Sequence, residues 1–402
     1  MKRRSHPSGR LRIAWLTLAV LLGFVALAWR TIQGGQGSAH SAAVGGLVPP
    51  PGAAAQVHGS RARVGPVDIV KGNDAALDAA WCGRAGGVVP PLGAQASSAA
   101  EQAMDDARRV LERDWLSALQ AQGSVRARGL ALALGLDPAS ASAPGQLAEL
   151  AATSQDPALI AWAIRFCDVG TACAAPMPRL WAARDPGNLA PWLAEFERAA
   201  AAGERGSLRE ALYQLGLAQR DDDYSRLALA MLEQVRRTEV PSLRASVEAQ
   251  QMMGRSMSMA RLGPWRALRA HCLDAVAQRD LDEQALCETA MDAIWRLDDS
   301  LVGATLASAL ARHLPHANEA LWAARRQQLD VYQALQAEWS GRYIALAEAG
   351  QPCAADAQLR EHVRALAQRG ERAALDAMLQ GRDAAKVARG AGARPPAAAP
   401  SP

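Results

Sequence analysis

Apolar residues recur with the periodicity of an α-helix from about residue 99 to residue 380, and this pattern restricts the fold of the chain more than any other feature. Apolar side chains recur at three- and four-residue intervals, as at Leu227, Ala230 and Met231, the spacing that gives an α-helix one apolar face. This stretch contains no convincing strand pattern. The pattern therefore predicts roughly a dozen helices joined by short loops.

Capping residues indicate where several of these helices begin and end. Asp156 precedes Pro157, which places an N-cap acceptor before a residue whose missing N–H costs nothing in the first helical turn. Two stretches have the arrangement of a capping box: Ser207 to Glu210 and Asp280 to Glu283. Three glycines stand where helices should end: Gly203, Gly350 and Gly370.

Short loops make consecutive helices antiparallel, which predicts the fold class. We expect an all-α domain built as an array of antiparallel helix hairpins, either an α-solenoid or an irregular bundle. The stretch Asn318–Ala349 fits one extended helix as well as a hairpin broken near Gly341. Eight tryptophans are spread through the helical region, where they are expected to wedge between helices, with an aromatic ligand groove as the alternative.

One stretch has the spacing of a helical repeat. A turn with Asp185, Pro186 and Asn188 precedes Trp192, and Gly203 and the apolar pair Ala211 and Leu212 follow. Over about residues 185–219 this resembles a tetratricopeptide repeat, which implies a helical interaction scaffold. The sequence departs from that family's preferences at Glu195, Phe196 and Leu208, and no second copy follows about 34 residues later.

The N-terminus has the pattern of a membrane segment. Ile13–Trp29 is an uncharged apolar run that would span about 25 Å as a helix, at the short end of what crosses a bilayer. Five basic residues precede the run and none follows between residues 31 and 60. The positive-inside rule predicts a single-pass anchor in a bacterial inner membrane, with a cytoplasmic N-terminus and a periplasmic body. A signal peptide cleaved after Ala28 is the alternative, because Ala26 and Ala28 have small-residue spacing.

Composition divides the chain into four parts: 1–32 with the anchor, a flexible Gly/Pro/Ala-rich linker at 33–98, the helical domain at 99–380, and a disordered tail at 381–402.

Five of the 44 basic residues lie in 1–12, which leaves 39 basic against 40 acidic residues in the remainder. This balance argues against nucleic-acid binding. No lysine lies between Lys71 and Lys386, which excludes a Schiff-base or phosphate-loop lysine there. The scarcity of lysine beside abundant Ala, Arg and Gly is typical of a GC-rich bacterial genome.

Six cysteines follow the apolar run, and an even number in an exported chain favours disulfides over reduced, buried thiols. Cys272 and Cys287 are equidistant from an expected turn at Arg279 and Asp280, each on the apolar side of its helix, and this predicts a bridge. Cys167 and Cys173 are close enough in sequence for a local bridge. Cys82 and Cys353 then pair by elimination.

No motif for catalysis, a metal or a cofactor stands out. His313 and His316 form a local pair without an adjacent acid, which suggests a solvent-facing loop. Residues 252–259 contain four methionines that suit either core packing or Cu(I): Met252, Met253, Met257 and Met259.

His362 lies in a polar helix and is interpreted as a surface residue. The acidic runs Asp221–Asp223 and Asp298–Asp299 are interpreted as helix N-terminal residues.

The features together favour one function class. We expect a membrane-anchored, periplasm-facing bacterial envelope protein that serves as a helical scaffold for an unidentified protein partner. The alternatives are an exported enzyme whose residues meet only in three dimensions and a Met-rich copper-binding module. A pocket that gathered His313, His316 or the acids at 221–223, with perturbed pKa values, would favour the enzyme.

Overall fold

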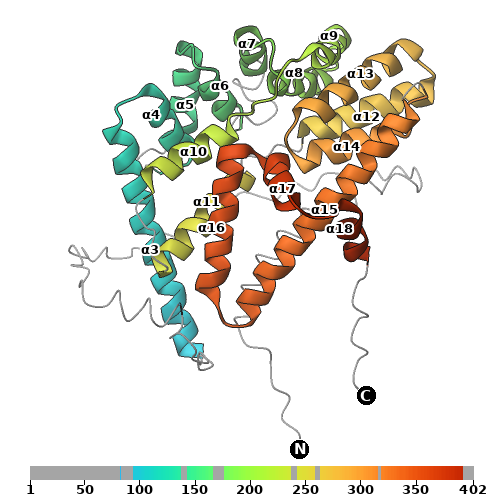
Figure 1. The fold of residues 1–402 in the computed structure, drawn as a ribbon. Helices are drawn as coiled ribbons and strands as arrows, with labels where there is room; N and C mark the ends of the chain where they lie inside the picture. Colours follow the sequence, from blue (N-terminus) through green and yellow to red (C-terminus); the bar gives the residue numbers. More distant parts are fainter. Residues whose placement is uncertain are drawn as a thin grey trace, which may run out of the picture. The chain divides into compact units, whose positions relative to one another are not determined.

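The computed structural model describes residues 82, 94–136, 143–165, 176–236, 242–258, 263–315 and 318–392, all within the unit Ala80–Pro402. These residues form an all-α structure with sixteen helices and no strand (Figure 1). The helices are α3 (Ala94–Ala121), α4 (Val125–Ala133), α5 (Ala143–Thr153), α6 (Pro157–Ile164), α7 (Pro176–Arg184), α8 (Leu189–Ala202), α9 (Arg205–Leu217), α10 (Ser225–Val235), α11 (Leu243–Ser258), α12 (Gly263–Gln278), α13 (Leu281–Leu297), α14 (Leu301–Ala311), α15 (Glu319–Glu348), α16 (Pro352–Arg369), α17 (Glu371–Leu379) and α18 (Ala384–Gly392). The all-α prediction is confirmed for the described part of the chain.

Most of the expected caps are present. The Asp156 carboxylate accepts a hydrogen bond from the Ala158 N–H at the start of α6, and Asp280 accepts one from the Glu283 N–H at the start of α13. Gly203 closes α8 with φ +68°, a left-handed conformation in which a side chain would be strained. The capping box expected at Ser207 is wrong, because α9 already begins at Arg205, and the Ser207 hydroxyl instead donates to the Glu204 carboxylate.

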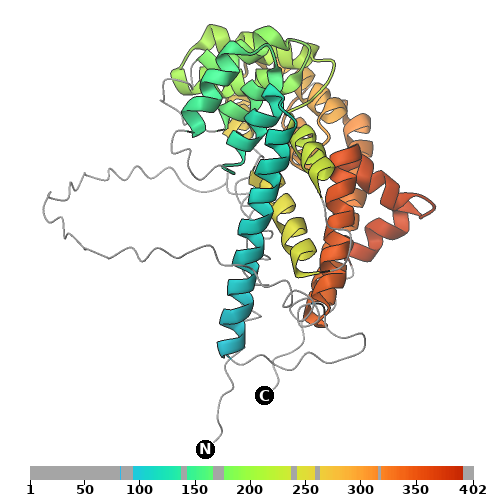
Figure 2. The same ribbon diagram turned by 90° about the vertical axis from the view of Figure 1, so that its left-hand side faces the viewer.

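The stretch Asn318–Ala349 forms one long helix, α15, with its two capping residues. The Asn318 side chain caps α15 by accepting a hydrogen bond from the Leu321 N–H, and the helix continues to Glu348 without a break at Gly341. α16 follows after a short turn and packs against α15. Figure 2 shows α11 beside both α3 and α16, in agreement with their mutual contacts.

The apolar interior forms two main clusters. The first joins α3 to α7 with α10, α11 and α16, around buried aromatic side chains such as Trp115 and Trp162. The second joins α8, α9, α12, α13 and α14, and it encloses Phe196 and Trp295. Six of the eight tryptophans are buried, in agreement with the expected wedge role: Trp115, Trp162, Trp181, Trp295, Trp322 and Trp339. The other two, Trp192 and Trp265, are half-buried.

A polar network joins the start of α8 to the segment between α9 and α10. The Asp185 carboxylate accepts hydrogen bonds from the Asn188 amide at 2.8 Å and the Tyr224 hydroxyl at 3.0 Å, and it pairs with Arg220. Asn188 is fully buried, and its amide also exchanges hydrogen bonds with both backbone groups of Asp222. The turn that resembles a repeat motif in sequence therefore ties both ends of the α8–α9 hairpin together.

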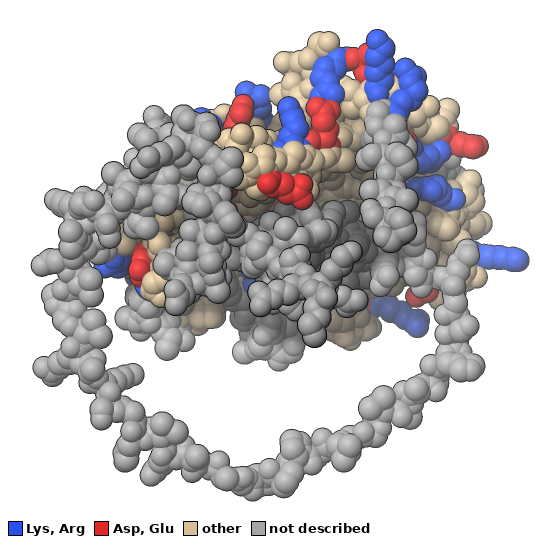
Figure 3. Space-filling model, turned by 90° about the horizontal axis from the view of Figure 1, so that it is seen from below, with Lys and Arg blue, Asp and Glu red and all other residues tan. Residues whose placement is uncertain are grey.

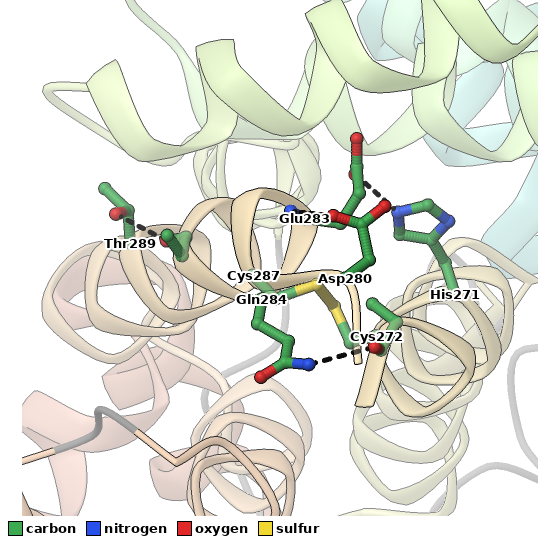
Figure 4. The surroundings of a disulfide bond; sticks show 9 residues. His271, Cys272, Asp280, Glu283, Gln284, Cys287 and Thr289 are labelled. Atoms are coloured by element: carbon green, nitrogen blue, oxygen red, sulfur yellow. Dashed lines mark hydrogen bonds and ion pairs between the residues drawn. A yellow bond between two sulfur atoms is a disulfide. The ribbon is translucent and has the colours of Figure 1, made fainter. Parts of the chain in front are cut away.

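Two cysteine pairs lie at disulfide distance, and both coincide with pairings expected from the sequence. Cys272 and Cys287 link α12 to α13 with their Cα atoms 5.8 Å apart (Figure 4). The helices turn at Arg279, as expected, with a left-handed φ of +57°. Cys82 and Cys353 have Cα atoms 4.9 Å apart and join the segment before α3 to the start of α16. Cys167 and Cys173 lie outside the described residues.

The helical region extends beyond both expected boundaries. α3 begins at Ala94 rather than after residue 98, and α18 covers Ala384–Gly392, where a disordered tail was expected. α18 packs against α15 through Val387 and Ala388, which explains why this segment is helical. The apolar run Ile13–Trp29 lies outside the described residues. None of the helices that the structure describes combines the length and hydropathy needed to cross a bilayer.

Candidate functional site

A shallow, open cleft lies where α7, α8 and α9 meet. Its volume is about 250 Å³, and both apolar and polar residues line it. The residues that line it are Arg179, Ala182, Ala183, Trp192, Glu195, Ser207 and Glu210. The sequence shapes the cleft locally, because the turn at Asp185–Asn188 folds α8 back beside α7 and Gly203 folds α9 back beside α8.

Trp192 supplies the aromatic wall of the cleft. It lies in the first turn of α8, and its Nε1 donates a hydrogen bond to the Pro186 carbonyl oxygen at 2.7 Å, which fixes the orientation of the ring. Ala182 and Ala183 are short side chains and leave the space open on the α7 side. The indole polar group is therefore satisfied within the chain, and its apolar surface remains for a ligand.

An arginine–glutamate network underlies the polar end of the cleft. Arg198 contacts Glu195 at 2.6 Å and Glu204 at 2.7 Å, and the Arg198 side chain is only 9% exposed. Arg179 pairs with the same two carboxylates from α7. The hydrogen bond from Arg198 lowers the pKa of Glu204 to about 2. The positive charges of the two arginines are thus offset by the negative charges of Glu195 and Glu204.

Glu210 differs from the other acids of the cleft. No described Arg or Lys lies within ion-pair distance of its carboxylate, and its one hydrogen bond comes from the neutral Gln214 amide at 2.8 Å. The side chain is exposed on α9 at the edge of the cleft. Glu210 therefore gives this edge one uncompensated negative charge.

The two acidic runs, interpreted separately in the sequence, come together in space. Asp221 interacts electrostatically with Asp298, Asp223 and Asp299, although the two runs are over 70 residues apart. Burial raises the pKa of Asp298 to about 7, and burial followed by the Asp298 charge raises that of Asp221. The sequence could not predict that the two acidic runs lie close together, because their proximity depends on how α10, α14 and α17 pack.

The acids of this group lie beside helix N-termini, as expected, but the N-cap residues themselves are Tyr224 for α10 and Ser300 for α14. Asp223 accepts hydrogen bonds from the Ser225 N–H and hydroxyl at the start of α10, and Asp298 accepts them from Ser300 before α14. Glu371 accepts one from the Leu301 N–H. The arrangement places carboxylates beside helix N-termini, where the helix dipole favours negative charge.

Among the residues with described side chains, His313 belongs to no group of three His, Cys, Asp or Glu that could hold a metal ion. His316 and Met259 lie outside the described residues, and Met252 is buried in the first apolar cluster. The surface interpretation of His362 is wrong, because this side chain is 8% exposed and stacks on Trp339 with ring centroids 4.2 Å apart. Burial lowers the pKa of His362 to about 4, so the ring is neutral at pH 7.

A buried acid that sequence reasoning missed lies between α3, α11 and α16. Glu248 is 2% exposed, and its Oε2 accepts no hydrogen bond from the described residues. Burial raises the pKa of Glu248 to about 7, although the Arg236 charge opposes the shift. The Trp115 indole also interacts with this carboxylate. An acid inside an apolar cluster is costly to ionise, so Glu248 titrates near neutral pH.

On the face shown in Figure 3, acidic and basic side chains of the described residues lie among one another. Comparison with known proteins gives no further guide: no protein-family model, curated protein or solved structure matches the chain.

Proposed function

We propose that this protein is a bacterial envelope protein, anchored in the inner membrane by Ile13–Trp29, whose periplasmic helical body binds a partner protein at the cleft of α7, α8 and α9. A body cleaved after Ala28 and released into the periplasm would bind in the same way. The observation that carries the binding role is the cleft itself, in which Trp192 presents an apolar surface beside polar groups already satisfied within the chain.

The cysteine pairs support the proposed compartment. Disulfides persist in oxidising spaces such as the periplasm and are rare in the cytosol of mesophilic bacteria. Cys272 and Cys287 are 1% and 0% exposed and lie within the second apolar cluster, so a bridge there would clamp α12 to α13. This agrees with export of everything after the apolar run.

Site-specific photocrosslinking in living cells tests the binding role. A photoreactive amino acid at the exposed position Ala183, in the cleft, is expected to capture a defined protein. The same group at the exposed position Glu361, on α16, serves as the matched control. Identical products at both positions, or none at Ala183, would count against a binding cleft.

Membrane topology is tested by reporter fusion. A periplasm-dependent phosphatase joined after Gly392 is expected to be active, and to lose activity when residues 1–32 are removed. N-terminal sequencing of the mature protein then separates the anchor from the cleaved leader, since cleavage would leave Trp29 as the first residue. Activity without residues 1–32 would contradict the proposed export.

A further inference from the structure

The charges around the cleft are unequal, and the inequality indicates which partner it fits. Arg179 and Arg198 are both held by Glu195 and Glu204. Among the residues that line the cleft, Arg179 is the one cation, and its charge is already paired. Glu210 has no such counterion, so its carboxylate is available to a cation that arrives with a ligand.

The size of the cleft limits what can enter it. A volume of about 250 Å³ is below the range of about 300–1,000 Å³ that drug-sized ligands occupy. With Trp192, Ala182 and Ala183 as its apolar surface, the space suits one large apolar side chain rather than a whole small molecule or a packed helix face.

Apolar surface continues along α9 beyond Glu210. Tyr213 is 49% exposed and Leu217 is 52% exposed, and they lie three and seven residues after Glu210, on the same outer face of the helix. Two of the six large apolar side chains that are exposed in the described part of the chain thus lie on the helix that borders the cleft. The Glu210 carboxylate thus lies between the apolar wall of the cleft and the exposed apolar side chains of Tyr213 and Leu217.

We infer that this surface binds a peptide segment of a partner protein in which an Arg or Lys stands beside a large apolar residue. The apolar side chain enters the cleft against Trp192, and the cation pairs with Glu210. Further apolar residues of the segment lie along Tyr213 and Leu217. The inference rests on the proposed function and specifies the chemistry of its partner.

Selection from a random peptide library on the full-length protein in detergent tests this directly. The wild-type protein is expected to enrich peptides with Arg or Lys next to Leu, Phe or Trp. Glu210→Arg should weaken the selected peptide about tenfold and shift the enrichment to Asp and Glu, because it turns an attraction into a repulsion. Ala183→Trp, a change at an exposed position that fills the cleft, should abolish the apolar preference.

Glu361→Arg is the matched control, since it makes the same charge change on an exposed face of α16 and should leave the selection unchanged. A library without basic enrichment, or an affinity that changes less than twofold in Glu210→Arg, would overturn the inference. So would a dimer that Glu210→Arg dissociates, or peptide binding that appears only after residues 393–402 are removed, because the surface would then be occupied by a second copy or by the chain's own tail.

The outcomes separate this inference from the proposed function. If crosslinking at Ala183 captures a partner but the library shows no basic preference, the binding role stands and the inferred chemistry of the partner is wrong. If the crosslinker captures nothing at Ala183, the proposed function fails first.

Discussion

Replacing Glu248 with glutamine should stabilise the protein above neutral pH and leave it nearly unchanged in acid. Glu248 is buried between α3, α11 and α16, and burial raises its pKa from about 4.5 to about 7. In the unfolded chain the carboxyl loses its proton near pH 4.5. The folded protein therefore binds the extra proton between these two values, and stability falls as the pH rises through this window.

The size of the effect follows from the shift. At 1.36 kcal/mol for each pH unit, a shift from 4.5 to about 7 corresponds to about 3 kcal/mol. That penalty is complete above pH 7 and absent below pH 4. Glutamine has nearly the same shape and cannot ionise, so Glu248→Gln should gain about 3 kcal/mol over the wild type at pH 8 and close to zero at pH 4.

Urea unfolding of the full-length protein in detergent, followed by circular dichroism from pH 4 to pH 9, measures the difference. Asp298 and other buried acids also titrate in this range, so the informative quantity is the gap between variant and wild type rather than either curve alone. Glu361→Gln, an exposed exchange of the same kind, should show no such gap. A gap for Glu248→Gln that does not vary with pH would refute the reasoning.

The remaining predictions concern the disulfide and the polar turn. Replacing both Cys272 and Cys287 with alanine should lower the free energy of unfolding by about 3 kcal/mol, the value expected for a disulfide that closes a loop of this length. Urea unfolding without reductant measures this loss, and an unchanged unfolding midpoint would contradict the prediction. Asn188→Ala should cost about 2–4 kcal/mol, because it removes a helix cap, takes one donor from the Asp185 carboxylate and leaves the backbone N–H and carbonyl of Asp222 without their Asn188 partners. The matched change Asn318→Ala, at an exposed cap, should cost only about 1 kcal/mol.

Local patterns in the sequence predicted the parts of the fold that depend on neighbouring residues. The α12–α13 hairpin and its cysteine pair could be placed because Cys272 and Cys287 are equidistant from the turn at Arg279 and Asp280. Asp156 and Asp280 cap their helices as expected, because an N-cap is satisfied within a few residues. Ser207 does not cap its helix, because α9 begins three residues earlier than the capping-box spacing indicated.

Features that depend on packing between distant helices could not be predicted in this way. His362 lies among polar neighbours on α16, but its ring is covered by Trp339 of α15, and no spacing on one helix reveals a partner on another. The meeting of Asp221 with Asp298 and the burial of Glu248 are of the same kind. The cleft likewise needs α7, α8 and α9 together, so the sequence placed Trp192 in a repeat-like stretch and among eight expected wedges without indicating where a cleft would form.

The proposed function requires a helical body whose cysteines are oxidised in the cell, and thiol trapping in intact cells tests this most directly. Cells are quenched in acid, the protein is denatured without reductant, and all free thiols are alkylated before peptide mass analysis. We predict that Cys272 and Cys287 carry no label and are recovered as one cross-linked peptide pair. Full labelling of both residues in the unreduced sample would contradict the oxidised, exported body on which the proposed function rests.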